Sequence, residues 1–130
     1  MHKKYQDSLS EEQKRVLVDK ATEAPFSGKY LDHDKDGKYI CTACKTPLFS
    51  SRAKYESTTP GLIGWPSFSE VIAQGNVELK EDKSLLMKRT EVVCKKCGGH
   101  LGHVFDADDS PNGTHYCINS VSLDFQPDKK

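Results

Sequence analysis

The fold of this 130-residue chain is decided by Cys41-Thr42-Ala43-Cys44 and Cys94-Lys95-Lys96-Cys97, two C-x-x-C turns far apart in the sequence. Each turn presents two thiolates on one side of a tight knuckle, and two knuckles together make a tetrahedral site of four sulfurs. Such a site suits zinc, one ion per chain, held structurally because protein ligands fill every position. A redox-active dithiol is the alternative for a single C-x-x-C pair. Two pairs, each following a strand candidate, favour metal.

Outward from the knuckles, short apolar segments alternate with turn residues from Lys38 onward, which is typical of a small β-rich domain. We expect strands at residues 39–41, 48–49, 85–93 and 114–125. Residues 67–74 favour one or two helical turns instead.

The N-terminal segment predicts a short amphipathic helix. Ser8 followed by Glu11 resembles a capping box, residues 11–20 are good helix formers, and Pro25 stops the helix. Residues 25–38 are rich in turn formers. The sequence therefore predicts one domain over residues 1–130, with a helical segment at 1–24 and a zinc-bound β core at 38–126.

Charge and hydropathy exclude several classes of function. Nineteen basic residues balance nineteen acidic ones, so no field attracts nucleic acid or anionic lipid. No apolar run approaches the ~20 residues of a membrane span, and residues 1–17 lack the apolar stretch of a secretory signal. We therefore expect a cytoplasmic protein without nucleic-acid or membrane partners.

The fifth cysteine, Cys117, lies in a predicted strand whose alternation places His115, Cys117 and Asn119 on one face. Tyr116 and Ile118 then point into a core. A buried structural cysteine is the alternative to a reactive one, and this segment alone leaves both open. A change of exposure should follow near residue 120, where the strand becomes apolar on the same face.

Two further segments carry residues suited to chemistry. His100 and His103 directly follow the second knuckle, so a metal there would fix where they point; such histidines hold a thiolate or donate a proton. They are alternatively metal ligands, but four cysteines already saturate one zinc. Trp65, within Gly64-Trp65-Pro66-Ser67-Phe68, is either core or the apolar wall of a small-ligand pocket.

Together these segments resemble the B-type methionine sulfoxide reductases, which reduce the R epimer of methionine sulfoxide. The resemblance covers nearly the whole chain: residues 9–13 and 22–30, both knuckles, residues 64–68 and 100–105, and residues 117–123. It implies a mainly β fold of two small antiparallel sheets with a short N-terminal helix, and a zinc far from the active face.

The resemblance also implies roles for single residues. Cys117 is the expected nucleophile, with His100, His103 and Asn119 around the substrate oxygen and the thiol. The expected substrate-binding residues are Trp65, which with help from Phe68 holds the methyl group, and His115, which stands where the family usually has Arg.

The expected reaction is attack by the Cys117 thiolate on the sulfoxide sulfur while water or a histidine protonates the oxygen. Methionine leaves and Cys117 becomes a sulfenic acid, which thiols reduce. Many relatives carry a resolving cysteine just before the Gly-Trp-Pro segment, where this chain has Ile63. A small thiol or thioredoxin is then expected to regenerate the Cys117 thiol. The substrate is expected free or within oxidised proteins, and the protein as a monomer.

A different class of function is a zinc-knuckle module that grips a peptide or protein, with Trp65 in its groove. The thiol reactivity of Cys117 in the zinc-loaded protein distinguishes it from an enzyme. A zinc-ribbon nucleic-acid binder would need basic charge that this chain lacks.

Overall fold

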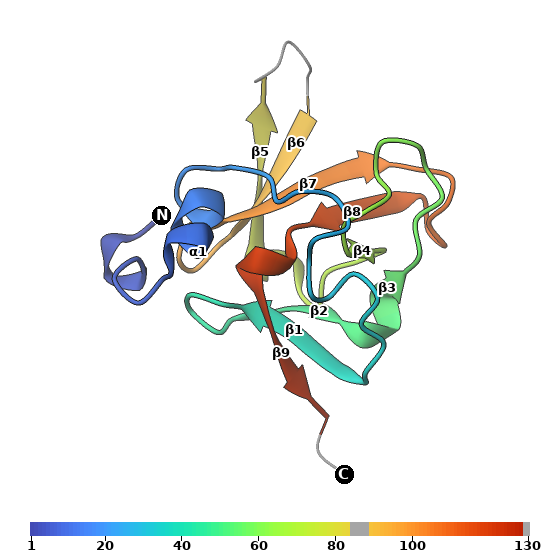
Figure 1. Cartoon of the computed structure of the whole chain (residues 1–130). Helices are drawn as coiled ribbons and strands as arrows, with labels where there is room; N and C mark the ends of the chain where they lie inside the picture. The colour runs from blue at the N-terminus through green and yellow to red at the C-terminus, as the bar shows by residue number, and fades with distance from the viewer. Residues whose placement is uncertain (84–88, 129–130) are drawn as a thin grey trace.

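The computed structural model describes residues 1–83 and 89–128, which form two antiparallel sheets and one α-helix (Figure 1). The smaller sheet has the order β2-β1-β9 and the larger one β3-β4-β8-β7-β6-β5. The strands are β1 Gly37–Cys41, β2 Pro47–Ser50, β3 Lys54–Tyr55, β4 Ser67–Phe68, β5 Val77–Asp82, β6 Arg89–Cys94, β7 His100–Asp106, β8 Thr114–Ile118 and β9 Leu123–Pro127. The mainly β fold with two antiparallel sheets and one short N-terminal helix is thus confirmed.

The N-cap of helix α1, Glu11–Leu17, lies two residues later than predicted. Ser10 is the N-cap: its Oγ accepts from the Gln13 N–H, and the Gln13 side chain accepts from the Ser10 N–H. The predicted capping box at Ser8 is therefore wrong. Leu9 lies between the two serines and is buried outside the helix, so the helix begins after it.

The predicted strand over residues 114–125 is two strands that belong to different sheets. β8 ends at Ile118, a 3-10 turn follows (η5, Ser120–Ser122), and β9 pairs with β1 in the smaller sheet. The turn is fixed by the Ser122 hydroxyl, which donates to the His100 carbonyl at 2.8 Å. The expected change near residue 120 is thus a crossing between sheets and not a change of exposure, because His115 and Asn119 are already buried.

Other expectations for secondary structure were met only in part. Residues 67–74 are not helical: β4 pairs with β8, and a 3-10 turn (η3, Gln74–Asn76) follows. The strand predicted at 85–93 is seen as β6, although its first four residues lie outside the described part. Charged β5 and glycine-containing β7 were missed because neither shows the alternation expected of a strand.

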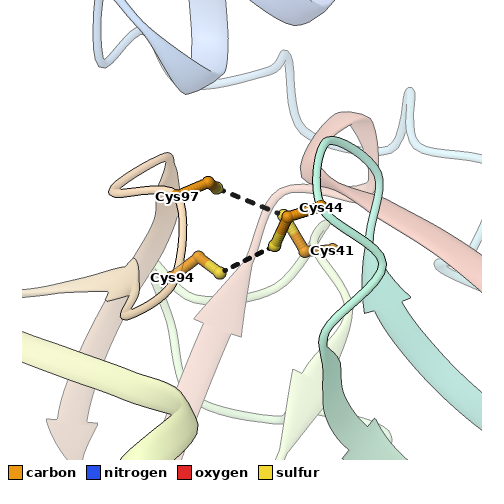
Figure 2. A group of neighbouring side chains, drawn as sticks. All are labelled: Cys41, Cys44, Cys94 and Cys97. Carbon is orange, nitrogen blue, oxygen red and sulfur yellow. Dashed lines mark hydrogen bonds between the residues drawn. The ribbon is translucent and has the colours of Figure 1, made fainter. Parts of the chain in front are cut away.

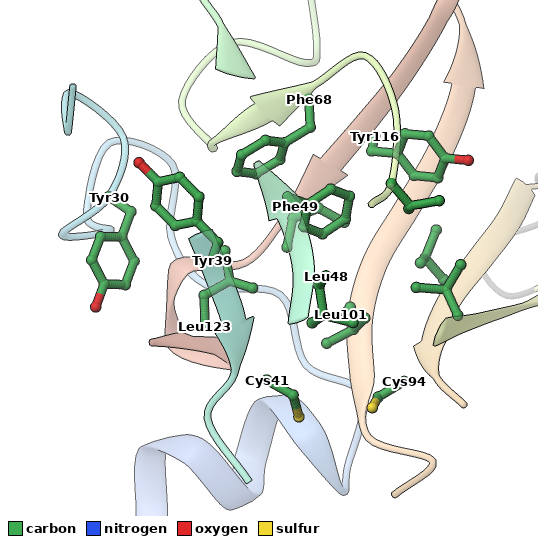
Figure 3. Close-up of a cluster of buried hydrophobic side chains, with 14 of the residues drawn as sticks. Tyr30, Tyr39, Cys41, Leu48, Phe49, Phe68, Cys94, Leu101, Tyr116 and Leu123 are labelled. Carbon is green, nitrogen blue, oxygen red and sulfur yellow. The ribbon is translucent and has the colours of Figure 1, made fainter. Parts of the chain in front are cut away.

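The core lies between the two sheets and combines aromatic rings with aliphatic side chains and cysteines (Figure 3). Phe49 of the smaller sheet stacks on Phe68 of the larger sheet, with ring centroids 4.4 Å apart, and Tyr39 meets Phe68 edge to face. Burial of each such ring stabilises the fold by roughly 2 kcal/mol. Further 3-10 turns are formed at Lys3–Tyr5 (η1) and Ser51–Ala53 (η2).

Candidate functional site

The four knuckle cysteines meet at one edge of the core, where the sheets converge (Figure 2). All four sulfurs lie within 4.8 Å of one another. Cys41 Sγ is 3.6 Å from Cys97 Sγ, and Cys44 Sγ is 3.4 Å from Cys94 Sγ. Thiolates bound about 2.3 Å from one zinc lie about 3.8 Å apart at the corners of a tetrahedron. The cluster therefore has the donors and nearly the dimensions of a closed zinc site.

The two knuckles share one backbone design. The carbonyl of the first cysteine accepts from the N–H four residues on: Lys45 N–H to Cys41 O at 2.8 Å, and Gly98 N–H to Cys94 O at 2.7 Å. Lys45 and Gly98 both have left-handed φ, 66° and 77°. Each turn thus closes on itself with both sulfurs on one side.

Cys117, the cysteine outside this cluster, lies on β8 beside a small cavity of about 80 Å³. Strands β7 and β8, the start of β6, the segment after α1 and the loop before β4 supply its walls. Four predicted site residues come together here: Cys117, His103, Asn119 and Trp65. Gly61, Leu62 and Phe105 complete much of the lining.

The thiol of Cys117 is protonated at neutral pH in this setting. Burial raises the pKa of Cys117 to about 12, and the nearby Glu23 carboxylate acts in the same direction. The surroundings of Cys117 therefore do not stabilise its thiolate form before substrate binds.

His103 and His100 are each oriented by a carboxylate. His103 Nε2 is 2.7 Å from the Asp82 carboxylate, and His100 Nδ1 is 2.7 Å from that of Glu91. The two imidazoles meet edge to face at 5.4 Å. His103 lines the cavity, whereas His100 lies behind it and is 2% exposed. Burial lowers the pKa of His100, which therefore stays neutral at pH 7.

A residue that sequence reasoning missed, Glu23, joins two walls of the cavity through its backbone. The Trp65 indole N–H donates to the Glu23 carbonyl at 2.9 Å, and the Glu23 N–H donates to Asn119 Oδ1 at 3.0 Å. Glu23 is 3% exposed, and its carboxylate accepts from the Val121 N–H. A Cβ at Gly28 would overlap the Glu23 and Ser120 side chains, so glycine is needed there. No periodicity marks Glu23, since it lies in a loop.

Phe68 and His115 do not line the cavity, and their predicted contact with substrate stays a prediction. Phe68 is fully buried in the aromatic core, because its pairing opposite Tyr116 turns it to the core face of the sheet. His115 is also fully buried, covered by Tyr55 and Asp109. Its Nδ1 is 3.5 Å from Asp109 Oδ1.

The loop that carries Gly61 and Leu62 to the cavity is anchored by Asp109. Oδ2 of Asp109 accepts from Ser57 Oγ and the Thr58 N–H, both at 2.9 Å, and from the Thr59 N–H at 3.2 Å. Burial alone would raise the pKa of Asp109, but these hydrogen bonds hold it well below its usual range. Asp109 is thus ionised and holds in place the loop that forms one wall of the cavity.

Comparison with known proteins identifies the family of this chain. The family model of the SelR domain matches residues 9–127. A peptide methionine sulfoxide reductase MsrB from Methanosarcina barkeri is 52% identical over 122 residues, covering 94% of this chain and 83% of that protein. The chain belongs to the MsrB family. Another MsrB, from Methanosarcina mazei, is 54% identical over 117 residues, covering 90% of this chain and 81% of that protein.

A vertebrate member of the MsrB family is also similar. The mitochondrial methionine-R-sulfoxide reductase B2 of Danio rerio is 46% identical over 133 residues, covering 97% of this chain and 72% of that protein. Among solved structures, the Yippee-like domain of Mis18 shares the fold, with a TM-score of 0.57, 17% identity, and coverage of 74% of this chain and all of that one. Within the described residues, no helix has the length and apolarity needed to cross a membrane.

Proposed function

We propose that this protein reduces the R epimer of methionine sulfoxide, free or within oxidised proteins, with Cys117 as nucleophile. The observation that carries the proposal is the meeting of one thiol, one indole and one imidazole at a cavity sized for a small side chain, in a member of the MsrB family. The sequence has five cysteines, and four of them form the metal cluster. Only Cys117 is left to react.

The reaction balances without another reactant. The Cys117 sulfur attacks the sulfoxide sulfur and forms an S–S bond while the oxygen takes up a proton. The oxygen then passes to Cys117 as the S–S bond and the S–O bond of the substrate break, which leaves Cys117 as a sulfenic acid. Methionine leaves, reduced by two electrons, while the cysteine is oxidised by two. Because the thiol keeps its proton until substrate binds, that proton is available to the sulfoxide oxygen, directly or through His103.

The other residues at the cavity have separate proposed roles. The Trp65 ring packs against the methyl group of the substrate, and the indole is held in place by its hydrogen bond to the Glu23 carbonyl. His103 and Asn119 face the oxygen as polar partners. His100 acts behind His103 as a positioning residue, through their ring contact.

For the cysteine cluster we propose a structural zinc bound by Cys41, Cys44, Cys94 and Cys97. Bound zinc would supply no reaction step there, since its four positions are filled by protein, but would stabilise the fold. The knuckles belong to β1 and β6, one in each sheet. The site therefore ties the two sheets together at the edge of their shared core.

Regeneration is proposed to need an external thiol. Ile63 occupies the place where many relatives have a resolving cysteine, and it is 43% exposed on the loop before Trp65. A small thiol or thioredoxin would then attack the Cys117 sulfenic acid directly. The cytoplasmic location and the monomeric state stay predictions; reducing conditions would suit the unpaired thiols.

The decisive experiment measures reduction of each methionine sulfoxide epimer by the zinc-loaded protein, first with dithiothreitol and then with thioredoxin. We expect the R epimer alone to be reduced, and Cys117→Ser to abolish the activity while zinc content and fold persist. Cys44→Ser serves as the matched control at a metal ligand and should lose zinc instead. No reduction of either epimer by the folded, zinc-loaded protein would favour a zinc-knuckle binding module.

A further inference from the structure

A second, larger cavity of about 460 Å³ adjoins the Cys117 cavity. We call it the acidic groove. It lies between the turn-rich segment at residues 26–36 and the segment at residues 51–65. Its apolar lining comes from Phe26, Leu31, Tyr55, Ile63 and Trp65, and its carboxylates from Asp32, Asp34, Asp36 and Glu56.

The acidic groove borders the proposed active site at Trp65. Trp65 lines both cavities. The loop before it contributes Gly61 and Leu62 to the Cys117 cavity and Ile63 to the groove. A methionine sulfoxide side chain held against Trp65 therefore brings its own backbone to the border between the two. The neighbouring residues of a polypeptide substrate would lie along the groove.

Two apolar side chains on the groove wall are unusually exposed. Phe26 is 68% exposed and Ile63 is 43% exposed, and both are among the few large hydrophobic side chains exposed in the described part of the chain. Phe26 also has a left-handed φ of 66°, which is uncommon for a bulky residue, and its N–H donates to the Gly64 carbonyl at 2.8 Å. The backbone thus holds an aromatic ring at the surface beside the active-site loop.

The net charge of the groove indicates which peptide segments it would bind. Four carboxylates face one ammonium group, that of Lys54, whose Nζ donates to the Leu31 carbonyl at 2.7 Å. His33, the remaining titratable base, stays neutral at pH 7 because burial lowers its pKa. The lining therefore carries about three net negative charges, although the whole chain is neutral.

We propose that the acidic groove binds the polypeptide segment next to the oxidised methionine and favours segments that carry Lys or Arg. This rests on the proposed reductase function and extends it to substrate choice among proteins. Apolar contact with Phe26 and Ile63 and attraction to the carboxylates supply the binding. Free methionine sulfoxide has no flanking side chains, so it does not use the groove.

The test compares three substrates with the zinc-loaded full chain and dithiothreitol. They are free methionine-R-sulfoxide and two acetylated pentapeptides with methionine-R-sulfoxide at the centre, flanked on both sides by Lys in one and by Glu in the other. The groove variant is Asp32→Asn/Asp34→Asn. The matched control is Asp7→Asn/Asp19→Asn, which changes the net charge equally at exposed carboxylates outside the groove.

We expect kcat/KM for the Lys peptide to exceed that for the Glu peptide by about tenfold at low salt. The groove variant should reduce this ratio about threefold, and added salt should reduce it similarly. The control variant should keep the ratio, and activity on free substrate should be equal in all three proteins. Phe26→Ala should lower kcat/KM for both peptides without affecting free substrate.

Two failures are distinguishable. The groove proposal is overturned if the wild type uses both peptides equally, or if the groove and control variants lose the preference to the same extent. In either case, activity on free substrate would still support the proposed function. A wild type that reduces none of the three substrates overturns the proposed function and the groove with it.

Discussion

The Cys117 thiol should be far less ionised at neutral pH than an ordinary cysteine. Burial raises its pKa to about 12, with the Glu23 charge adding to the effect. An exposed cysteine titrates near pH 8.5, so the thiolate population at pH 7 should be lower by about three orders of magnitude. Only the thiolate reacts with an alkylating reagent, so the rate of alkylation reports this population.

The assay follows iodoacetamide labelling of Cys117 in the zinc-loaded protein by mass spectrometry of the peptide that contains it. From pH 7 to pH 10 the rate should rise about tenfold per pH unit with no plateau, because this whole range lies below the pKa. Glutathione, an ordinary thiol, serves as the control and should level off near pH 9. Circular dichroism at each pH verifies that the fold persists.

A second variant tests the cause. Glu23→Gln keeps an oxygen that can accept from the Val121 N–H and removes the charge. It should move the alkylation profile of Cys117 to lower pH, while most of the shift, which is due to burial, persists. A wild-type plateau at or below pH 9 would refute the reasoning. The cavity would then stabilise a resting thiolate, and a reaction that begins from the protonated thiol would be wrong.

Four further outcomes are expected. Cys94→Ser should lose zinc by elemental analysis and unfold at markedly lower denaturant, because structural zinc contributes folding free energy. Trp65→Ala should raise KM about tenfold and change kcat less, since its ring is proposed to contact only the methyl group. Unchanged kinetics would mean that Trp65 is a core residue without a role in substrate binding. Without reductant, the enzyme should release about one methionine per chain and stall with one added oxygen on Cys117; a disulfide to a knuckle cysteine, with zinc released, would contradict this. Asp109→Ala should free the loop at residues 57–59, raise KM about fivefold and cost about 2 kcal/mol of stability, whereas Asp108→Ala, the exposed neighbour, should do neither.

Much of the fold and of the site follows from local pattern. The two C-x-x-C turns predict four clustered sulfurs because each turn fixes its own two cysteines, and the structure places all four within 4.8 Å. The alternation of β8 predicts Tyr116 and Ile118 in the core, and both are there. Trp65, His103 and Asn119 are recognised from short motifs, and they do share the Cys117 cavity.

The sequence by itself determined which groups are available: four sulfurs for a metal, one remaining thiol, and the histidines and indole near it. Tertiary structure alone decided which of these meet. Alternation gives a strand two faces but does not specify what covers them. The burial of Phe68 depends on Tyr39 and Phe49 from distant segments. The burial of His115 depends on the distant Tyr55 and on Asp109 in the loop before β8. The pKa of Cys117 follows the same rule, because desolvation is a property of the packed surroundings and no local sequence pattern specifies it.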